Sequence, residues 1–380
     1  CAMAALCDSI PGKEAPMKAV VRPIELPPGR RVLVVSDIHG NLTFLKGVLS
    51  KAGFSKEDIL ILLGDLLERH EDSFDTVRYV MELSQTHTVY TILGNCDNVV
   101  LDFVDQNGTE HEEFYRDRWF KMGERSILVK MAHLAGVTVD TPFDYAAARA
   151  AIAENFKPEL DFLRGLPHIY VNHNYLFVHG GVPRENHLEE LEAFSCMKND
   201  DFLNQGHAFR RWVVVGHWPV TLYRDDIPPA APIIDKERHI VSIDGGCVLK
   251  WDGQLNALIL PEEPGGEFSY VSYDGFPEMT AQDSQESSPD PVNIRFGHSR
   301  VEVLERGEEL CRCRHVESGR VVDILTEYLW EKEGEIYCED STDYLLPVEP
   351  GDRLAIVRRL SDLVLSKKEG ATGWYFGRLT

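Results

Sequence analysis

The chain has 380 residues, of which 43% are hydrophobic, a length and composition that suit a globular protein of two domains. Its formal net charge is -23, from 62 acidic and 39 basic residues. An acidic surface repels nucleic-acid phosphates and anionic lipids, which excludes nucleic acid and membranes as main partners, whereas it attracts cations.

Short apolar runs alternate with helical periodicity in the first third of the chain. Residues 1–30 are interpreted as an N-terminal extension outside the fold. Helices are predicted at 42–51 and 74–83, and buried strands at Val32–Val35, Ile59–Leu63 and Thr88–Leu93. Each of these strands ends in a polar cluster, at the edge where open α/β sheets bind ligands.

The middle of the chain combines a helical segment with a second set of strands. Residues 98–165 are rich in helix formers and predict a helical, cap-like insertion. Further strands are predicted at Tyr175–Val178, Trp212–Val215, His239–Ile243 and Leu255–Leu260. The Gly, Ser and Pro content of 263–293 is typical of a linker, and short strands between glycine or charged turns predict a small β domain at 294–380.

The cysteines and the apolar runs indicate a cytoplasmic location. Eight cysteines show no paired C-x-x-C spacing, so we expect reduced thiols rather than a zinc knuckle. The sequence has no run of eighteen apolar residues, so no membrane-spanning helix is expected, and its N-terminus lacks the basic and apolar regions of a signal peptide.

Five short polar clusters recur along the chain, each directly after an apolar strand. A single D-x-H or G-H pair is weak evidence, but five in succession indicate one composite site. The clusters are Asp37-Ile38-His39-Gly40-Asn41, Gly64-Asp65-Leu66-Leu67-Glu68-Arg69, Gly94-Asn95-Cys96-Asp97, His179-Gly180-Gly181 and Gly216-His217.

The residue types in these clusters predict a site for two metal ions. Asp37 and His39 alternate at a strand end and can reach one ion, while the Asp65 carboxylate can bridge two. An amide and two imidazoles complete the second coordination sphere: Asn95, His179 and His217. Such mixed ligands suit Mn, Fe or Zn, as divalent or trivalent ions, better than Ca or Mg. Two ions about 3.5–4 Å apart can generate hydroxide at neutral pH and clamp a phosphoryl group.

Together, the clusters resemble the motif set of the calcineurin-like metallophosphoesterases, in the order of the phosphoprotein phosphatase (PPP) family. The resemblance covers residues 31–262 and extends to His179–Pro183 and Ile243–Cys247. It implies an α+β fold, a β-sandwich flanked by helices. It also implies that Arg69 grips the phosphate oxygens, a bidentate task that suits arginine.

The C-terminal residues carry a second resemblance. Gly351-Asp352-Arg353-Leu354, followed by Trp374-Tyr375-Phe376-Gly377, resembles the end of a Src-homology-3-like barrel. A small β-barrel that recruits a peptide partner is therefore expected at 294–380.

The chain departs from the PPP pattern where that family keeps its general acid. Cys96 stands in place of a His, and Glu68 in place of the Asp that precedes the arginine. A thiol is a poor proton donor beside two cations, because its pKa is near 8.5 and the cations favour thiolate. His70, directly after Arg69, and Asp97 are the alternative acids, each weighed against a solvent-facing or packing role.

The leading hypothesis is hydrolysis of a phosphate monoester, on a phosphoprotein or a small metabolite, by a metal-bridging hydroxide. A phosphodiesterase or dinucleoside polyphosphate hydrolase is the alternative, since leaving groups of low pKa need less help from an acid. The second alternative is a non-catalytic binding scaffold that retains the phosphoesterase fold as a platform.

Overall fold

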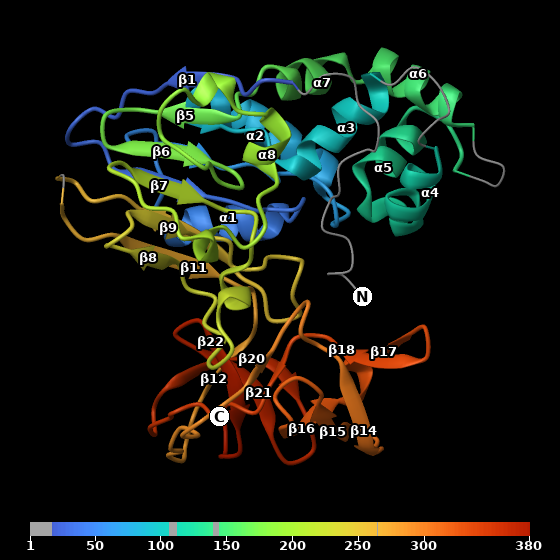
Figure 1. The fold of residues 1–380 in the computed structure, drawn as a ribbon, viewed down its shortest axis with the longest axis vertical. Coiled ribbons are helices and arrows are strands. Elements are labelled where there is room, and N and C mark those ends of the chain that lie inside the picture. Colours follow the sequence, from blue (N-terminus) through green and yellow to red (C-terminus); the bar gives the residue numbers. More distant parts are fainter. Residues whose placement is uncertain (1–16, 106–111, 140–143, 264) are drawn as a thin grey trace.

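The computed structural model describes residues 17–105, 112–139, 144–263 and 265–380. They form two lobes, an upper lobe of two sheets with helices and a lower lobe of small sheets near the C-terminus (Figure 1). Within this described part of the chain, none of the helices is long and apolar enough to cross a membrane.

The upper lobe is a β-sandwich, as predicted. One sheet has five strands in the order β11 (Ser269–Tyr273), β10 (Leu255–Ile259), β2 (Val32–Val35), β3 (Ile59–Leu62), β4 (Thr88–Thr91). The other has six in the order β1 (Val21–Pro23), β5 (Ile169–Val171), β6 (Tyr175–Val178), β7 (Trp212–Val215), β9 (Ile240–Ser242), β8 (Ile233–Asp235).

Alternating side chains separate the inner and outer faces of these sheets. Val34 and Ile61 of the five-stranded sheet share an inner core with Phe177 and Val214 of the six-stranded sheet. On the outer face of the five-stranded sheet, Leu33 and its neighbours pack into a second core with the helices. This alternation is the pattern of a sandwich whose outer faces are also covered.

Most of the helices pack on the five-stranded sheet or gather at one end of the upper lobe, and one short helix packs on the six-stranded sheet (Figure 1). They are α1 (Leu42–Lys51), α2 (Ser73–Thr86), α3 (Asn95–Asp105), α4 (Glu112–Arg118), α5 (Ile127–Leu134), α6 (Tyr145–Asn155), α7 (Lys157–Arg164) and α8 (Ala193–Met197). Side-chain caps fix two of the starts: Asn41 Oδ1 accepts from Phe44 N at 3.0 Å, and Asp144 Oδ1 accepts from Ala147 N at 2.9 Å. The predicted insertion is helical, and buried Trp119 and Tyr115 join it to the main core.

The lower lobe consists of small sheets rather than one long one. A four-stranded sheet contains β12 (Glu278–Thr280), β20 (Arg353–Arg359), β21 (Val364–Lys368) and β22 (Ala371–Tyr375). A three-stranded sheet contains β14 (Val301–Glu305), β15 (Leu310–His315) and β16 (Val321–Leu325). Two further pairs join β17 (Leu329–Lys332) to β18 (Glu335–Cys338) and β13 (Asn293–Ile294) to β19 (Ser341–Thr342). The barrel itself stays a prediction.

Two segment boundaries need correction. Part of the supposed extension 1–30 belongs to the sandwich, because β1 pairs in parallel with β5, Val21 opposite Ile169; residues 1–16 lie outside the described residues. The supposed linker 263–293 contains β11, which pairs with β10, and β12, which pairs with β20. Both β1 and β11 are half-exposed edge strands, so the sequence lacks the apolar run that reveals a buried strand.

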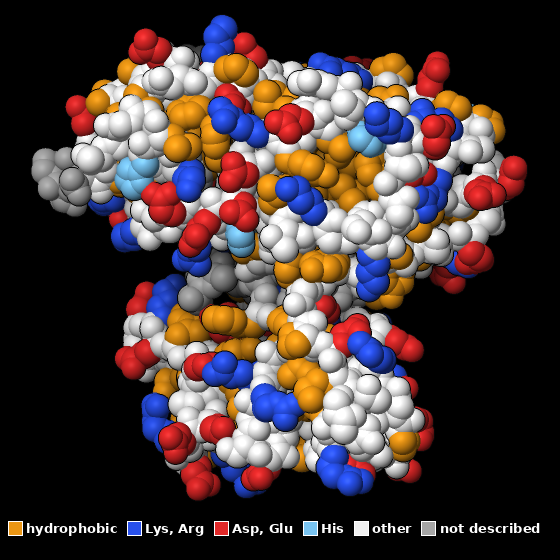
Figure 2. Space-filling view, turned by 180° about the vertical axis from the view of Figure 1, so that it is seen from behind, with side chains coloured by type: hydrophobic (Ala, Val, Ile, Leu, Met, Phe, Trp, Pro, Cys, Tyr) orange, Lys and Arg blue, Asp and Glu red, His pale blue; other side chains and the backbone are white. Residues whose placement is uncertain are grey.

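The surface is acidic but not segregated by charge. On the face turned away in Figure 1, Lys and Arg side chains lie scattered among Asp and Glu (Figure 2). Many of the exposed charges form ion pairs, such as Arg353 with Glu278 and Lys236 with Glu267.

Candidate metal centre

The five predicted clusters come together at one edge of the sandwich. β2, β3 and β4 run parallel in register, with Val35 opposite Leu62 and Leu62 opposite Thr91, so the loops that follow them are neighbours. β6 and β7 are also parallel, and their loops meet the first set from the other sheet. The carboxyl ends of both sheets thus supply one site.

The loops at this edge have an unusual backbone. Six of its non-glycine residues have positive φ: Asp37, His39, Asp65, Glu68, Arg69 and His217. This region costs an ordinary residue about 1–3 kcal/mol and recurs at functional sites. Hydrogen bonds between loops hold the conformation, including His39 N to Asp65 O at 2.9 Å and Gly40 N to Leu66 O at 2.7 Å.

Two glycines allow the loops to approach this closely. A Cβ on Gly216 would lie 1.8 Å from Ser36 Oγ and 2.3 Å from Asp37 Oδ2. A Cβ on Gly94 would lie 2.1 Å from the backbone nitrogen of Asp65. A larger residue at either position would therefore displace a predicted metal ligand.

The first group of donors joins Asp37, His39 and Asp65. His39 Nε2 lies 3.9 Å from Asp37 Oδ1 and 3.8 Å from Asp65 Oδ2. Asp37 Oδ1 and His39 Nε2 are both buried without a hydrogen-bond partner. Buried polar atoms normally have partners, so these orphaned atoms fit a cation held between them.

The second group joins Asp65, Asn95 and His179. The backbone oxygen of Leu63 can only accept, so at 2.7 Å it fixes the proton of His179 on Nδ1. Nε2 then lies 3.1 Å from Asn95 Oδ1 and 3.4 Å from Asp65 Oδ1. In the neutral ring these three atoms are all acceptors, so a positive centre must lie between them, either a proton on Nε2 or a metal ion in its place.

His217 completes the second group, with ligand atoms of Asp65, His179 and His217 all within 4.8 Å of one another. Its Nε2 lies 2.7 Å from Asp200 Oδ1, which leaves Nδ1 available to an ion. A carboxylate behind a ligating imidazole orients the ring and increases its basicity.

The electrostatics of the site favour bound cations. Burial raises the pKa of Asp37, and the neighbouring charge of Asp65 raises it further. Burial lowers the pKa of His39 to about 4, which keeps its imidazole neutral and able to ligate. Burial also lowers the pKa of His179, yet the charges of Asp65 and Asp37 raise it to about 10. The proton retained by His179 occupies the position where a metal would compete with it.

The four residues predicted for catalysis lie in different surroundings. Arg69 is buried beside His39, whose pKa its charge helps to lower. The Cys96 thiol lies within 4.8 Å of the ligand atoms of His39 and Asp65, and its backbone nitrogen donates to Asp65 Oδ1 at 2.8 Å. Glu68 Oε1 accepts from Ser126 Oγ and Ile127 N, both at 3.1 Å, and so anchors the start of α5. His70, with a side chain 36% exposed, lies near Asp72.

Asp97, the alternative acid, is fully buried and bound to the loops. Its Oδ1 accepts from Leu66 N and Leu67 N, and its Oδ2 from Gly94 N. Burial and the charge of Asp65 raise its pKa to about 7. Its observed contacts join the second cluster to the third.

Three further residues of the site were missed from the sequence. Ser36 Oγ donates to Asp37 Oδ2 at 2.5 Å, and Asp200 Oδ1 lies 2.7 Å from His217 Nε2. Asp244 is fully buried, and the charge of Asp37 raises its pKa. Asp244 lies in the Ile243–Cys247 segment, which resembles the metallophosphoesterase pattern, so the sequence could have revealed it. Ser36 and Asp200 belong to no spacing pattern, so only the fold reveals them.

The β-sandwich and the buried carboxylates and imidazoles at its edge define a class of protein: an α+β domain with a site suited to cations. Residues 30–239 match the family model for calcineurin-like phosphoesterases, which is more than half of the chain. The chain belongs to the calcineurin-like phosphoesterase family and is a hydrolase acting on phosphate ester bonds. The predicted resemblance to the calcineurin-like metallophosphoesterases is confirmed.

Individual relatives are more distant. An asymmetrical bis(5'-nucleosyl)-tetraphosphatase, PrpE, of Oceanobacillus iheyensis is 22% identical over 261 residues, covering 61% of this chain and 90% of that relative. A symmetrical bis(5'-nucleosyl)-tetraphosphatase of Pectobacterium atrosepticum is 42% identical over 65 residues, which are 17% of this chain and 22% of that relative. A protein serine/threonine phosphatase structure from Saccharomyces cerevisiae is 12% identical, covers 69% of this chain and 85% of its own, and has a TM-score of 0.39.

Proposed function

We propose that the chain is a dinuclear metal-dependent phosphoesterase. Asp37, His39 and Asp65 would hold one ion, and Asn95, His179 and His217, with Asp65 shared, the other. Bound ions would supply an activated water as nucleophile and neutralise charge on the phosphate. The observation that carries the proposal is the pair of orphaned buried atoms, Asp37 Oδ1 and His39 Nε2.

The protein's own residues would bind and orient the substrate. Arg69 would hold phosphate oxygens and fix the phosphorus against the site; its burial and the effect of its charge on the pKa of His39 support this role. Ser36 and the backbone nitrogen of His217 both donate to Asp37 Oδ2, which turns Oδ1 toward the site. The carboxylate of Asp200 orients the ring of His217 in the same way, because it lies 2.7 Å from Nε2 and leaves Nδ1 toward the site.

Phosphate monoesters, the leading expectation from the sequence, remain the first candidate substrates. The second candidate is a dinucleoside polyphosphate, and two observations favour it. The buried Cys96 thiol stands where PPP enzymes have an acid, and a phosphate leaving group needs little protonation. The Oceanobacillus relative is a bis(5'-nucleosyl)-tetraphosphatase. We therefore infer a substrate with a weakly basic leaving group.

This inference predicts a steep dependence of rate on the leaving group. With Mn²⁺ present, p-nitrophenyl phosphate should be hydrolysed faster than glycerol phosphate by roughly 10²–10⁴-fold, the usual contribution of a general acid. Measuring kcat/KM for both esters, for bis(p-nitrophenyl) phosphate and for diadenosine tetraphosphate checks it.

Equal rates on the two monoesters would show that an acid is present and would contradict the inference. A strong preference for the diester or the dinucleotide over every monoester would exclude the first candidate. A protein without stoichiometric metal, in which Asp65→Ala loses no activity, would instead support the scaffold alternative, because that variant removes the carboxylate shared by both groups.

A further inference from the structure

A loop between β9 and β10 reaches from the metal centre to the lower lobe. We call residues 244–254 the bridging loop. Its turn is closed by hydrogen bonds from Gly246 N to Asp244 Oδ1 at 2.8 Å and from Lys250 N to Gly246 O at 3.0 Å. Val248 within it has a φ of 65°, which a β-branched residue adopts only when its surroundings enforce it.

One end of the bridging loop supports the first metal-ligand cluster. Asp244 is fully buried just after β9, which runs parallel to β7 and therefore ends at the same edge as the loop that carries His217. The thiol of Cys247 contacts the backbone oxygen of Ile38 at 3.7 Å. Ile38 lies between Asp37 and His39, so a shift of this end would displace both ligands.

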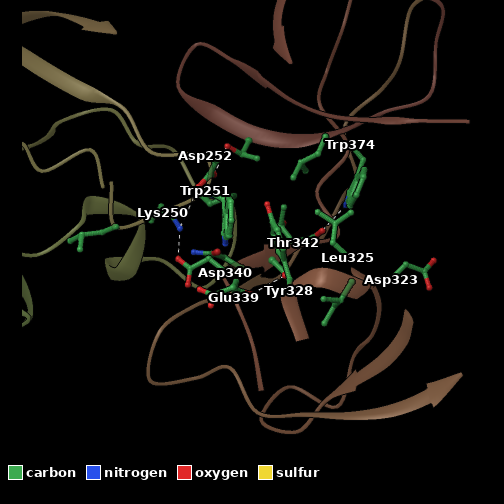
Figure 3. A pocket seen from close by; sticks show the side chains of 17 residues that line it. Lys250, Trp251, Asp252, Asp323, Leu325, Tyr328, Glu339, Asp340, Thr342 and Trp374 are labelled. Carbon is green, nitrogen blue, oxygen red and sulfur yellow. Dashed lines mark hydrogen bonds and ion pairs between the residues drawn. The ribbon is translucent and has the colours of Figure 1, made fainter. Parts of the chain in front are cut away.

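The other end of the bridging loop is fastened to the lower lobe by buried charges. Lys250, with a side chain 2% exposed, forms an ion pair with Asp340 (Figure 3). Lys367 of β21, equally buried, donates to Asp252 O at 2.9 Å and to Gln254 Oε1 at 2.8 Å. Thr372 of β22 donates to Asp252 Oδ2 at 2.6 Å.

Aromatic packing accompanies these charges. The ring of Trp251 stacks on that of Tyr328, with centroids 5.9 Å apart and planes 18° apart, although Trp251 is 66% exposed. Figure 3 shows both rings beside Lys250 and Asp340, in the pocket between the loop and the lower lobe. Solvated loops seldom contain buried lysines, so these contacts fix the bridging loop in one position.

We propose that Lys250 and Asp340 are positioning residues for the metal centre: their ion pair holds the bridging loop, and with it Asp244 and Cys247, against the strand end that carries Asp37 and His39. This role rests on the proposed function, because the residues positioned by the lower lobe belong to the proposed metal site. It also gives the lower lobe a part in catalysis that is independent of any peptide partner.

The test compares two variants with a matched control. Asp340→Asn removes the charge but can retain the hydrogen bond from Phe296 N to Oδ1, which is 3.1 Å long in the structure. The double variant Lys250→Met/Asp340→Asn removes both charges of this pair. Asp252, the second partner of Lys250 at 3.7 Å, keeps the hydrogen bond from Thr372, so most of the stability lost in Asp340→Asn should return. The control is Arg353→Met, which breaks the exposed pair with Glu278 elsewhere in the lower lobe.

The readouts are kcat and KM for p-nitrophenyl phosphate with Mn²⁺, metal content, Tm, and hydrogen–deuterium exchange of residues 245–253. The double variant should lose roughly ten- to hundred-fold in kcat, the effect of a small misplacement, with KM and metal content near wild type. Its bridging loop should exchange faster, whereas the control should match wild type in every readout.

Wild-type kcat and wild-type exchange in the double variant would overturn the positioning role. A wild-type protein inactive on both p-nitrophenyl esters would count against the proposed function instead. In that case metal content and exchange decide the positioning role: faster exchange of residues 245–253 in the double variant, with metal content near wild type, supports it, and unchanged exchange refutes it.

Discussion

Gly216 shows how a single atom constrains the metal centre. It directly precedes His217, and a Cβ there would overlap Ser36 Oγ and Asp37 Oδ2. Gly216→Ala is therefore expected to destabilise the protein by at least about 2 kcal/mol, through overpacking of a buried site that cannot relax freely. Thermal unfolding followed by circular dichroism measures the change, and the metal content should fall with it.

Gly165→Ala is the matched control. Gly165 ends α7 with ordinary helical angles, and its added Cβ would meet only the carbonyl oxygens of Phe162 and Asp161, at 3.2 and 3.3 Å. Its effect should stay below about 1 kcal/mol. Equal losses in the two variants would mean that Gly216 is ordinary loop backbone.

At the residue scale, the sequence predicts the ligands better than their supports. Asp37, His39 and Asp65 follow apolar strands at short spacing, and their donor atoms converge in the structure. Asp200 lies 17 residues from His217 in an irregular loop, where no periodicity marks it. Glu68 was predicted at a catalytic position from a motif, but its observed contacts anchor α5, a relation between distant segments that spacing cannot express.

At the level of elements, the pairing of β1 with β5 depends on one buried histidine. His168 Nδ1 accepts from Val20 N at 3.0 Å, and His168 N donates to Val20 O at 2.9 Å. Burial lowers the pKa of His168 to about 4, so the folded protein keeps it neutral. Protonation of Nδ1 would remove the acceptor that holds β1 in place.

This lowered pKa predicts a loss of stability in mild acid. The unfolded chain binds a proton at His168 below its ordinary pKa of about 6.5, whereas the folded chain does so only below about 4. The free energy of unfolding should therefore fall as the pH drops from about 6.5 to 4, by about 3 kcal/mol from this group. Urea unfolding of wild type and His168→Gln across this range measures the difference.

His173→Gln serves as the control, because His173 lies exposed in the turn after β5. It should retain the wild-type pH slope, while His168→Gln flattens it. The same slope in all three proteins would show that His168 does not govern the acid response.

The interior elements were predictable because burial leaves a strong signal. β2, β6, β7 and α1 have the bounds that apolar runs and helical periodicity predict. The edge strands were not predictable, since Ser269–Tyr273 reads Ser-Tyr-Val-Ser-Tyr, without a continuous apolar run, among flanking Gly and Pro. Pairing with a neighbour forms such strands, and a single sequence does not show that neighbour.

At the scale of the whole molecule, the chain connects the lobe with the metal centre to the lower lobe through continuous structure. β10 and β11 complete the upper sheet, and the chain then enters the lower lobe through β12 without a free linker. Lys250 and Lys367 add buried contacts across this junction. These buried lysines pair with Asp252, Asp340 and Asp274, so their positive charges offset acidic charge at the junction of the two lobes, although the net charge of the chain is -23.

Metal analysis of the purified chain tests the central claim most directly. Elemental quantification, with anomalous scattering to locate the ions, should find two ions per chain between Asp37, His39, Asp65, Asn95, His179 and His217. Asp65→Ala should lose both. Protein that binds no stoichiometric Mn, Fe or Zn, or ions located at the exposed His187, Glu189 and Glu190 instead, would contradict the account.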